Sequence, residues 1–263
     1  MNEDHLPLAG RRAVVTGAGR GIGHAIALAL AAAGTDVALC ARSHAELEQV
    51  AEELRALGRR ALALPCDVTN AAAVARMAEE VTAGLGGIDI LVNNAGAAAS
   101  HKFVDHPDEL WHYMLAVNLT SVYYVTKAFV PQMVAQRSGR VITIASIAAK
   151  IGARYTAAYT ASKHGVLGLT RALAAELVGY NITVNAICPS YVDTPMTDGS
   201  IANIVKRTGM SEAQARETLE KMSPQARLIA PEEIAALTVY LAQESSRGIT
   251  GQAINVDGGA VMF

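Results

Sequence analysis

The sequence alternates short, apolar, β-branched runs with stretches of helical periodicity, and this alternation constrains the fold more than any other feature of the chain. Such alternation is typical of a parallel sheet whose strands are joined by crossover helices. The runs are apolar almost throughout, as expected of strands covered on both faces. We predict seven strands, at Ala13–Thr16, Asp36–Cys40, Ala61–Pro65, Ile88–Asn93, Arg140–Ala145, Thr183–Cys188 and Gln252–Val256.

The helical stretches between these strands complete a doubly wound α/β fold. We see no linker, repeat or low-complexity tract, so residues 1–263 are predicted to form one domain. Residues 195–225 break the alternation with a polar, charged and partly helical stretch, which we interpret as a substrate lid or mobile loop. The predicted helices are Gly23–Ala33, Ala45–Leu57, Ala71–Gly84, Asp108–Met133, Ala157–Leu177 and Pro231–Ala242.

Composition narrows the classes of protein to which the chain can belong. It is 51% hydrophobic and 17% charged, as in globular proteins, and its net charge of −2 predicts no basic face for nucleic acid or a membrane surface. Cys40, Cys66 and Cys188 are interpreted as small buried residues in a reducing compartment, with no metal site. The polar start Met1–Asp4 is unlike a signal peptide, and the apolar stretch Ala25–Ala33 is too short to span a bilayer. We therefore expect a cytoplasmic protein without membrane association.

A glycine-rich segment, Thr16–Gly23, follows the first predicted strand and opens the first helix. Glycines allow a tight turn and a close backbone approach to a diphosphate, and a helix N-terminus offers free N–H groups. The segment alone is weak evidence, but its strand–turn–helix context predicts dinucleotide binding. The residues expected to contact the cofactor here are Gly17, Arg20, Gly21, Ile22 and Gly23.

The end of the second strand bears on which nicotinamide dinucleotide is bound. NAD sites place an acid there for the ribose 2′-hydroxyl, whereas this chain has Arg42 and Ser43 and no acid. Asp36 stands at the opposite end of the strand. Arg42, helped by Arg20 and Ser43, is predicted to bind the 2′-phosphate of NADP. The alternative is that Arg42 is only a solvated strand-end residue and that NAD is the cofactor.

Tyr159 and Lys163 lie four residues apart, so on a helix both project from one face, and Ser146 precedes Tyr159 by thirteen residues. A positive charge near a phenol favours the phenolate and lowers the phenol pKa. A tyrosine so placed can exchange a proton with a carbonyl or alcohol oxygen. The spacing also arises by chance on many helices, so it gains weight only with the other motifs.

These motifs together resemble the short-chain dehydrogenase/reductase family over nearly the whole chain. The resemblance implies a Rossmann-type fold and a hydride-transferring enzyme. The matching segments, in order, are Thr16–Gly23, Asn93–Gly96, Asn118, Ser146, Tyr159–Lys163 and Pro189–Thr194.

The resemblance also implies roles for the four residues of the expected catalytic set. Tyr159 would be the acid/base, and Ser146 would hold the substrate oxygen. Lys163 would lower the Tyr159 pKa and bind the nicotinamide ribose, while Asn118 would position a water leading to Lys163. The resemblance implies further cofactor contacts in addition to those of the glycine turn, Arg42 and Ser43. Asp67 and Val68 would contact the adenine, and Val192 and Thr194 would bond the carboxamide. The other implied contacts are Asn94, Ala95, Gly96, Tyr159, Lys163 and Pro189.

Ser190 departs from the family pattern, which usually has Gly after the proline. If that position requires a positive backbone φ, the serine would be mildly strained there.

The predicted function is hydride transfer between NADP(H) and a carbonyl or secondary alcohol of a small molecule. Specificity is expected from Ala97–Phe103, Ile147–Tyr155 and the 195–225 segment. A weaker resemblance to ketoacyl and hydroxybutyrate-type members favours a 3-oxoacyl or small keto-acid substrate. Lys206 and Arg207 could then hold the phosphates of coenzyme A or of an acyl carrier, although the favoured interpretation is that they are solvated charges on an exposed helix.

Three alternative hypotheses about the function are still open on the sequence alone. One is a nicotinamide-binding sensor without turnover, another is a structural subunit, and the third is an isomerase or dehydratase that uses the same Tyr/Lys pair. The resemblance further implies a homo-oligomer, either a dimer or a tetramer.

Overall fold

The computed structural model describes residues 6–263, so the prediction about Met1–Asp4 lies outside the described residues. One parallel sheet of seven strands, in the order β3-β2-β1-β4-β5-β6-β7, forms its centre. The predicted Rossmann-type, doubly wound architecture is confirmed. The strands are β1 (Arg12–Thr16), β2 (Asp36–Ala41), β3 (Ala61–Pro65), β4 (Ile90–Asn93), β5 (Gly139–Ile144), β6 (Ile182–Pro189) and β7 (Ala253–Val256).

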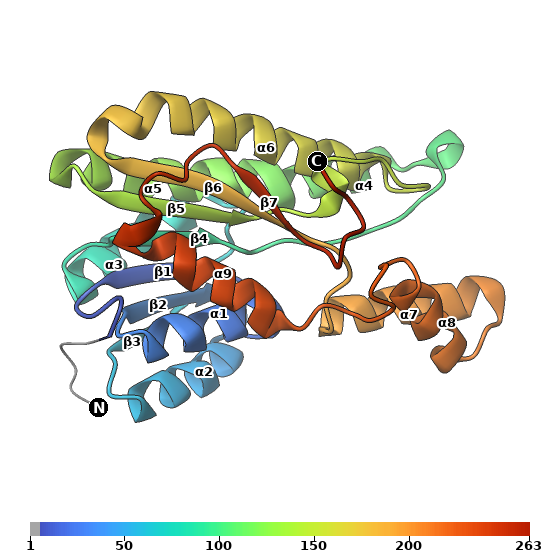
Figure 1. Cartoon of the computed structure of the whole chain (residues 1–263), viewed down its shortest axis with the longest axis horizontal. Helices are drawn as coiled ribbons and strands as arrows, with labels where there is room; N and C mark the ends of the chain where they lie inside the picture. The colour runs from blue at the N-terminus through green and yellow to red at the C-terminus, as the bar shows by residue number, and fades with distance from the viewer. Residues whose placement is uncertain (1–5) are drawn as a thin grey trace.

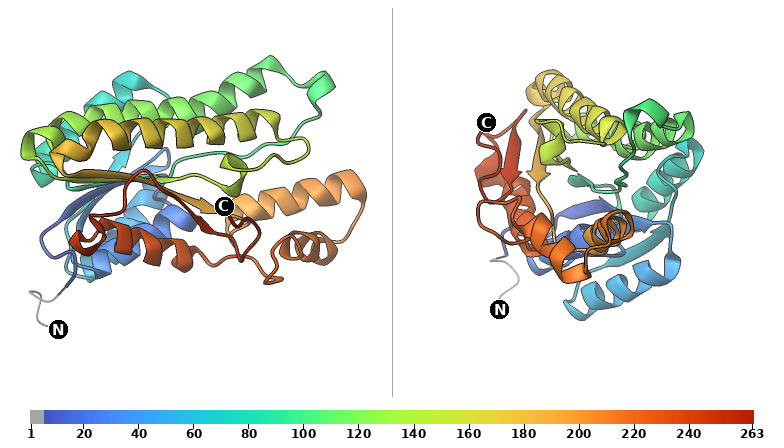
Figure 2. Two further views of the ribbon diagram at one scale, coloured as in Figure 1. Left: turned by 45° about the horizontal axis from the view of Figure 1, so that its top comes forward. Right: turned by 90° about the vertical axis from the view of Figure 1, so that its right-hand side faces the viewer.

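Helices cover both faces of the sheet (Figures 1 and 2). The helices α1, α2 and α9 pack on one face, and α3, α5 and α6 pack on the other. The five central strands are buried along nearly their whole length, since a strand between two helical layers has no solvated side, whereas the edge strands β3 and β7 are only partly buried. The helices on the sheet are α1 (Gly21–Ala32), α2 (His44–Ala56), α3 (Ala71–Leu85), α5 (Ser121–Gln136), α6 (Ala157–Leu177) and α9 (Pro231–Ala242). A further helix, α4 (Asp108–Leu115), packs against α6.

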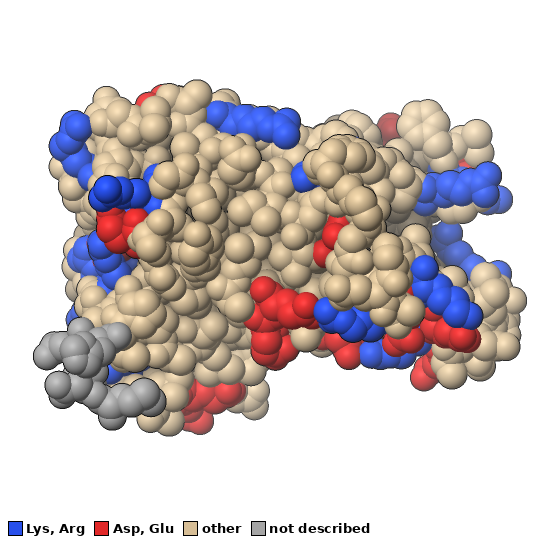
Figure 3. Space-filling model, in the orientation of Figure 1, with Lys and Arg blue, Asp and Glu red and all other residues tan. Residues whose placement is uncertain are grey.

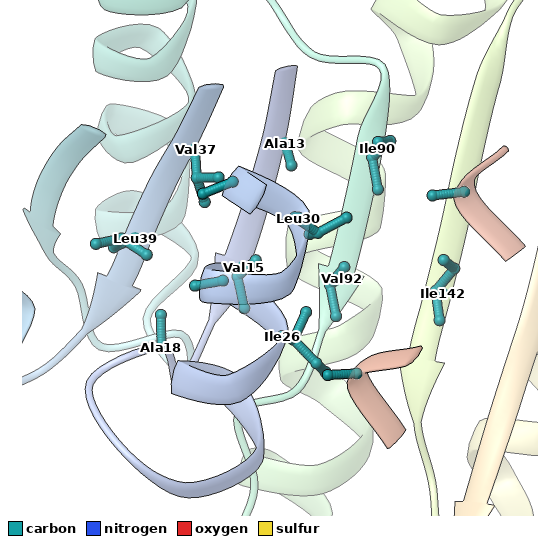
Figure 4. Packing of buried hydrophobic residues seen from close by; sticks show 14 of the residues in the cluster. Ala13, Val15, Ala18, Ile26, Leu30, Val37, Leu39, Ile90, Val92 and Ile142 are labelled. Atoms are coloured by element: carbon teal, nitrogen blue, oxygen red, sulfur yellow. The ribbon is translucent and has the colours of Figure 1, made fainter. Parts of the chain in front are cut away.

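Packing between α1 and the sheet sets the position of the first turn. Ile26 and Leu30 of α1 are fully buried against Val15 of β1 and Val92 of β4 (Figure 4). Burying such side chains stabilises the fold by about 1.5–3 kcal/mol each. Because α1 is held so firmly, its N-terminus stays directly beyond the carboxyl end of β1.

The predicted helix Asp108–Met133 is interrupted in the structure. The helix α4 ends at Leu115, a π-helical turn spans Ala116–Thr120, and α5 begins at Ser121. Local periodicity does not distinguish a π turn from an α-helix, because both keep an apolar stripe facing the core. Such turns are rare and recur at functional sites. This one carries the buried Asn118.

The segment after β6 contains two further helices, α7 (Pro195–Thr208) and α8 (Glu212–Glu220), in agreement with the partial helicity expected there. Gly209, with φ +74°, ends α7, and Ser211 begins α8 through a capping box with Gln214. The two helices extend beyond the carboxyl ends of the strands (Figure 1). Basic and acidic side chains lie side by side over this part of the molecule (Figure 3).

Short 3-10 turns complete the chain at Phe103–Asp105, Ile147–Ala149, Val178–Tyr180 and Glu244–Ser246. The three cysteines are buried free thiols, in agreement with the sequence-based interpretation. None of the described helices is both long and apolar enough to cross a membrane.

Candidate active site

The predicted site residues gather at the carboxyl ends of the strands, because every strand of the sheet runs in the same direction. The glycine turn follows β1, Asn94 follows β4, Ser146 follows β5, and the Pro189–Thr194 segment ends β6. Helix α6 brings Tyr159 and Lys163 to the same edge. Ligands of open α/β sheets bind at this edge.

The glycine turn is built around Asn94. Its Nδ2 donates to the carbonyls of Thr16, at 2.9 Å, and Gly17, at 3.1 Å. Gly17 has φ +65°, and a Cβ there would lie 2.9 Å from Asn94 Nδ2. Thr16 Oγ1 accepts the N–H groups of Asn94 and Ala95, each at 3.0 Å. The residues expected to line the cofactor therefore also hold the turn in shape.

The N-terminus of α1 has the features of an anion site. Its N-cap residue, Arg20, is extended and makes no side-chain cap, and the first turn carries no acidic residue. The first N–H groups of the helix and the positive end of its dipole thus lack an intramolecular anionic partner within the described residues. Gly21, with φ +58°, lets the chain enter the helix close to Thr194. These features fit the diphosphate of a dinucleotide.

Of the residues predicted to bind the 2′-phosphate, Ser43 and Arg20 already interact with Glu46. Arg42 is exposed just after β2 and makes no ion pair among residues 6–263. Ser43 is the N-cap of α2, and its Oγ accepts the Glu46 N–H at 3.4 Å. Arg20 forms an exposed ion pair with Glu46, Nη1 to Oε1 at 3.6 Å. Asp36 pairs instead with Arg60 at the amino end of the sheet.

Glu46 is therefore a site residue that sequence reasoning missed. A Cβ at Gly19 would lie 3.0 Å from Glu46 Oε2, so the carboxylate borders the glycine turn. The signal was present in the spacing Ser43-x-x-Glu46, which is typical of a helix N-terminus and places the acid in the first turn beside the turn glycines.

At the expected adenine end, Asp67 forms a tight local turn and Val68 is buried. Asp67 Oδ1 accepts both the N–H and the hydroxyl of Thr69, at 2.9 and 2.7 Å. These bonds, with a smaller contribution from Arg42, hold the pKa of Asp67 below its ordinary value. The structure thus keeps Asp67 as an anion close to Arg42.

Lys163 is buried, with 6% of its surface exposed. Its Nζ donates to the Ile144 carbonyl at 3.0 Å and lies 5.8 Å from the Tyr159 ring centroid. A Cβ on Gly96 would lie 3.8 Å from the same Nζ. Burial lowers the pKa of Lys163 to about 8, so the ammonium titrates close to neutral pH.

Tyr159 departs from one expectation. Its pKa is raised above the ordinary value, chiefly by burial, while a hydrogen bond with Ser146 opposes the shift and Tyr191 adds to it. The expected lowering of the Tyr159 pKa by Lys163 does not dominate, because desolvation of the buried phenol is the larger effect and the ammonium donates to the Ile144 carbonyl. The phenol is accordingly held in its neutral form.

Ser146 has two partners at the end of β5. Its Oγ accepts the Ala148 N–H at 3.1 Å, which caps the turn Ile147–Ala149, and it is hydrogen-bonded to Tyr159. The catalytic interpretation and the capping interpretation of Ser146 are therefore compatible.

Asn118 is also brought to this site, but its side chain is already engaged. Nδ2 donates to the Ala97 carbonyl and Oδ1 accepts the Ala97 N–H, each at 3.0 Å. The side chain thus fixes the loop after β4, and the expected water-positioning role stays a prediction.

The Pro189–Thr194 segment forms a short bridge with Ile229, through Val192. Thr194 lies against Gly21, so the segment expected to hold the carboxamide faces the glycine turn. Ser190 is not among the residues with positive φ. The expected strain at Ser190 is therefore absent, since its backbone conformation suits an L-residue.

Residues of α7, in the segment predicted to act as a lid, contact the loop that follows β4. Arg207 Nη2 donates to the Ser100 carbonyl at 3.1 Å, and Asn203 Nδ2 donates to Ser100 Oγ at 3.3 Å. The His101 N–H donates to the Tyr155 carbonyl at 2.7 Å, and Tyr155 has φ +68° although it is not glycine. Backbone strain of this kind concentrates at functional sites. Three segments expected to set specificity are thus joined by hydrogen bonds.

No group of three or more His, Cys, Asp or Glu side chains within residues 6–263 is arranged to hold a metal ion.

Several known proteins are similar to this chain in sequence and in fold. The chain matches the model of a family described as enoyl-(acyl carrier protein) reductase over residues 17–261. It is 38% identical over 252 residues to a D-beta-hydroxybutyrate dehydrogenase from Rhizobium meliloti, covering 95% of this chain and 98% of that protein. It is 37% identical over 253 residues to the 3-oxoacyl-(acyl-carrier-protein) reductase FabG from Staphylococcus aureus, covering 96% and 98%.

The crystal structure of an actinorhodin polyketide ketoreductase variant with NADPH superposes with a TM-score of 0.93 at 37% identity, covering 96% of this chain and 98% of the other. A short-chain type dehydrogenase/reductase from Mycobacterium marinum gives a TM-score of 0.88 at 36% identity, covering 99% of both chains.

Proposed function

The chain belongs to the short-chain dehydrogenase/reductase family and is an oxidoreductase, and from its site we propose that it reduces the keto group of a small molecule with NADPH. The observation that carries the proposal is the grouping of Ser146, Tyr159 and Lys163 at the edge of the sheet that also carries the uncapped N-terminus of α1. A phenol, a hydroxyl and an ammonium so placed serve one reacting oxygen next to a dinucleotide site.

The bound dinucleotide supplies the hydride, and the residues of the chain orient the reactants and move the proton. Ser146 and Tyr159 donate hydrogen bonds to the carbonyl oxygen, where negative charge develops as the carbon is reduced. Tyr159 then transfers its proton to that oxygen. Because burial raises the pKa of Tyr159, the phenol is protonated at neutral pH, which favours the reductive direction.

Lys163 supports the phenolate that remains after this transfer. Its Nζ lies 5.8 Å from the Tyr159 ring centroid, and its pKa of about 8 leaves it mostly charged at neutral pH. An ammonium in a buried site acts on a nearby anion with little screening. Lys163, together with Gly96, would also adjoin the nicotinamide ribose.

Preference for NADP is supported by Arg42, exposed at the end of β2 where NAD sites carry an acid. Arg20 and Ser43 would complete the 2′-phosphate site. The superposing ketoreductase was determined with NADPH. For the remaining cofactor residues, the sequence-based assignments are retained as part of this proposal.

The substrate that we propose is a 3-oxoacyl thioester, for which acetoacetyl-CoA is the simplest probe. Relatives named as ketoacyl reductase and as hydroxybutyrate dehydrogenase support a 3-oxo compound in general. We further propose that residues 195–225 act as a lid, that the chain forms one catalytic domain, and that the enzyme works as a cytoplasmic homo-oligomer, a tetramer or a dimer.

The test is the initial rate of NADPH oxidation with acetoacetyl-CoA, compared with NADH and with free acetoacetate. General acid catalysis contributes about 10²- to 10⁴-fold, so Tyr159→Phe should lose that much in kcat while still binding NADPH. Tyr113→Phe, at a half-exposed site on α4, is the matched control and should keep full activity. Turnover with free acetoacetate alone would overturn the thioester assignment. Turnover that survives in Tyr159→Phe would overturn the role of the tyrosine.

A further inference from the structure

The hydroxyl of Ser190 is a buried polar group without a partner. Its Oγ atom is shielded from solvent and finds no hydrogen bond among residues 6–263. Most buried polar groups are hydrogen-bonded, and a buried hydroxyl left unpaired destabilises the folded state. Ser190 also stands where the family usually has Gly, so this hydroxyl is a feature of this chain.

The position of Ser190 is fixed by the sheet. Its N–H donates to the Val256 carbonyl at 3.3 Å, which continues the parallel pairing of β6 with β7 for one residue beyond Pro189. Side chains two residues apart in a strand share a face, so the Ser190 hydroxyl lies on the same face as the Cys188 thiol. Cys188 packs with Val166 and Leu167 of α6.

That face is the face of the proposed reaction. The Cys188 thiol is close enough to Lys163 and to the Ser146 N–H for both to influence its pKa. Tyr191, the next residue after Ser190, is close enough to Tyr159 to raise the pKa of the phenol. Chain neighbours on both sides of Ser190 therefore lie near the proposed catalytic residues.

We propose that Ser190 Oγ is a hydrogen-bond partner of the carboxamide on the nicotinamide ring of the bound cofactor, an inference that rests on the proposed function. The reacting oxygen of the substrate is already served by Ser146 and Tyr159. The carboxamide, which the Pro189–Thr194 segment is expected to hold through Val192 and Thr194, offers both donors and an acceptor and can take a further partner from the same segment. A serine hydroxyl can bond to either. Thr194, near Gly21, marks the same segment as a wall of the cofactor site.

The experiment measures binding by calorimetry, without turnover, for wild type and Ser190→Ala. The ligands are NADPH and adenosine 2′,5′-bisphosphate, which lacks the nicotinamide half. Loss of one hydrogen bond should raise the dissociation constant for NADPH about threefold to tenfold. The bisphosphate should bind both proteins equally. Ser245→Ala, which removes an exposed serine hydroxyl on the turn Glu244–Ser246, is the control and should change neither affinity.

Thermal unfolding separates this role from a structural one. Ser190→Ala removes a hydroxyl that is unpaired in the structure, so its melting temperature without ligand should equal or exceed that of wild type. The increase in melting temperature on adding NADPH should be smaller than in wild type. Ser190→Gly should behave in the same way towards both ligands.

The outcomes distinguish this inference from the proposed function. Equal NADPH affinity in wild type and both Ser190 variants overturns the role of Ser190 and leaves the proposed function standing. Equal weakening of NADPH and the bisphosphate also overturns it, since the effect would not come from the nicotinamide end. If wild type binds neither NADPH nor NADH, the proposed function and this inference fail together.

Discussion

Asn118 and Ala97 exchange two hydrogen bonds, one from the Asn118 amide to the Ala97 carbonyl and one from the Ala97 N–H back to Asn118 Oδ1, each 3.0 Å long. The pair ties the π turn between α4 and α5 to the loop that follows β4. Gly96, one residue earlier in that loop, lies close to Asn118 Oδ1 and Lys163 Nζ. The contact thus links the π turn that carries the buried Asn118 to the position of Lys163, the proposed catalytic lysine.

Asn118→Ala should destabilise the protein by about 1–3 kcal/mol, since two partly buried hydrogen bonds are lost and the Ala97 N–H and carbonyl are left unpaired. Chemical denaturation measures the loss. The loop should also loosen, with faster amide exchange over residues 95–103 than over β5. Gln252→Ala, which removes a side chain bonded only to a nearby Thr250 carbonyl, is the control. Unchanged stability in Asn118→Ala would mean that the reciprocal pair contributes little.

Most strands and helices could be predicted because the pattern that defines each one lies within its own stretch of sequence. Apolar runs mark strands that are buried on both sides, and the actual ends of α6 and α9 match the predicted Ala157–Leu177 and Pro231–Ala242. The helix start at Pro231 follows from proline in the first turn, where its missing N–H costs nothing. The location of the site was predictable too, because parallel strands bring their carboxyl ends to one edge.

The remaining features depend on contacts between distant residues. Sequence spacing places Lys163 near Tyr159, but the direction of the Tyr159 pKa shift depends on burial by the whole fold. The π turn at Asn118 depends on its pairing with Ala97, which lies 21 residues away in the chain. A strained Ser190 was expected from the family pattern, and only the backbone angle shows that it is relaxed.

Arg42→Asp should shift cofactor preference from NADPH towards NADH. The substitution removes a cation from the proposed 2′-phosphate site and supplies the acid that a ribose 2′-hydroxyl favours. The ratio of kcat/KM for the two cofactors measures the shift, which should be at least about tenfold for loss of one charged hydrogen bond. Arg76→Asp, on the exposed side of α3, makes the same charge change as a control. A constant ratio in Arg42→Asp would remove Arg42 from the site.

Glu46→Gln should strengthen NADPH binding severalfold and leave NADH binding nearly unchanged. The Glu46 carboxylate now pairs with Arg20 at 3.6 Å and borders Gly19, so it competes with a 2′-phosphate and repels it. Since the pair is exposed, the effect should be modest and should decline at high salt. Fluorescence titration at two salt concentrations measures it. Weaker NADPH binding in Glu46→Gln would instead show that the pair helps to position Arg20.

Lys163→Met should stabilise the fold at pH 7 while it abolishes activity. The pKa of Lys163 falls from an ordinary 10.5 to about 8, so below pH 8 the folded state bears the cost of a buried charge. Removing the buried charge stabilises the variant, and losing the hydrogen bond to the Ile144 carbonyl partly offsets this. The net gain in the free energy of unfolding should be about 1–3 kcal/mol. Since the folded wild type loses its proton first, the gain should shrink as pH rises from 8 to 10.5. Denaturant melts at pH 7 and 10 measure this, with Lys127→Met at an exposed site as the control. A variant less stable than wild type at pH 7 would refute the argument.

The rate of keto reduction should fall as pH rises through about 8. Tyr159 stays protonated at this pH because burial raises its pKa. The fall in the pH–rate profile near pH 8 (its alkaline limb) is therefore assigned to Lys163, whose pKa is about 8. Above that pH the phenolate left after proton transfer loses its neighbouring positive charge, and Tyr159 becomes a poorer acid. In Lys163→Arg the guanidinium stays charged, so the limb near pH 8 should disappear even if the rate is lower at every pH. Single-turnover rates from pH 6 to 10 measure both profiles. A wild-type rate that is constant across this range, or an identical limb in Lys163→Arg, would assign the proton chemistry to another group.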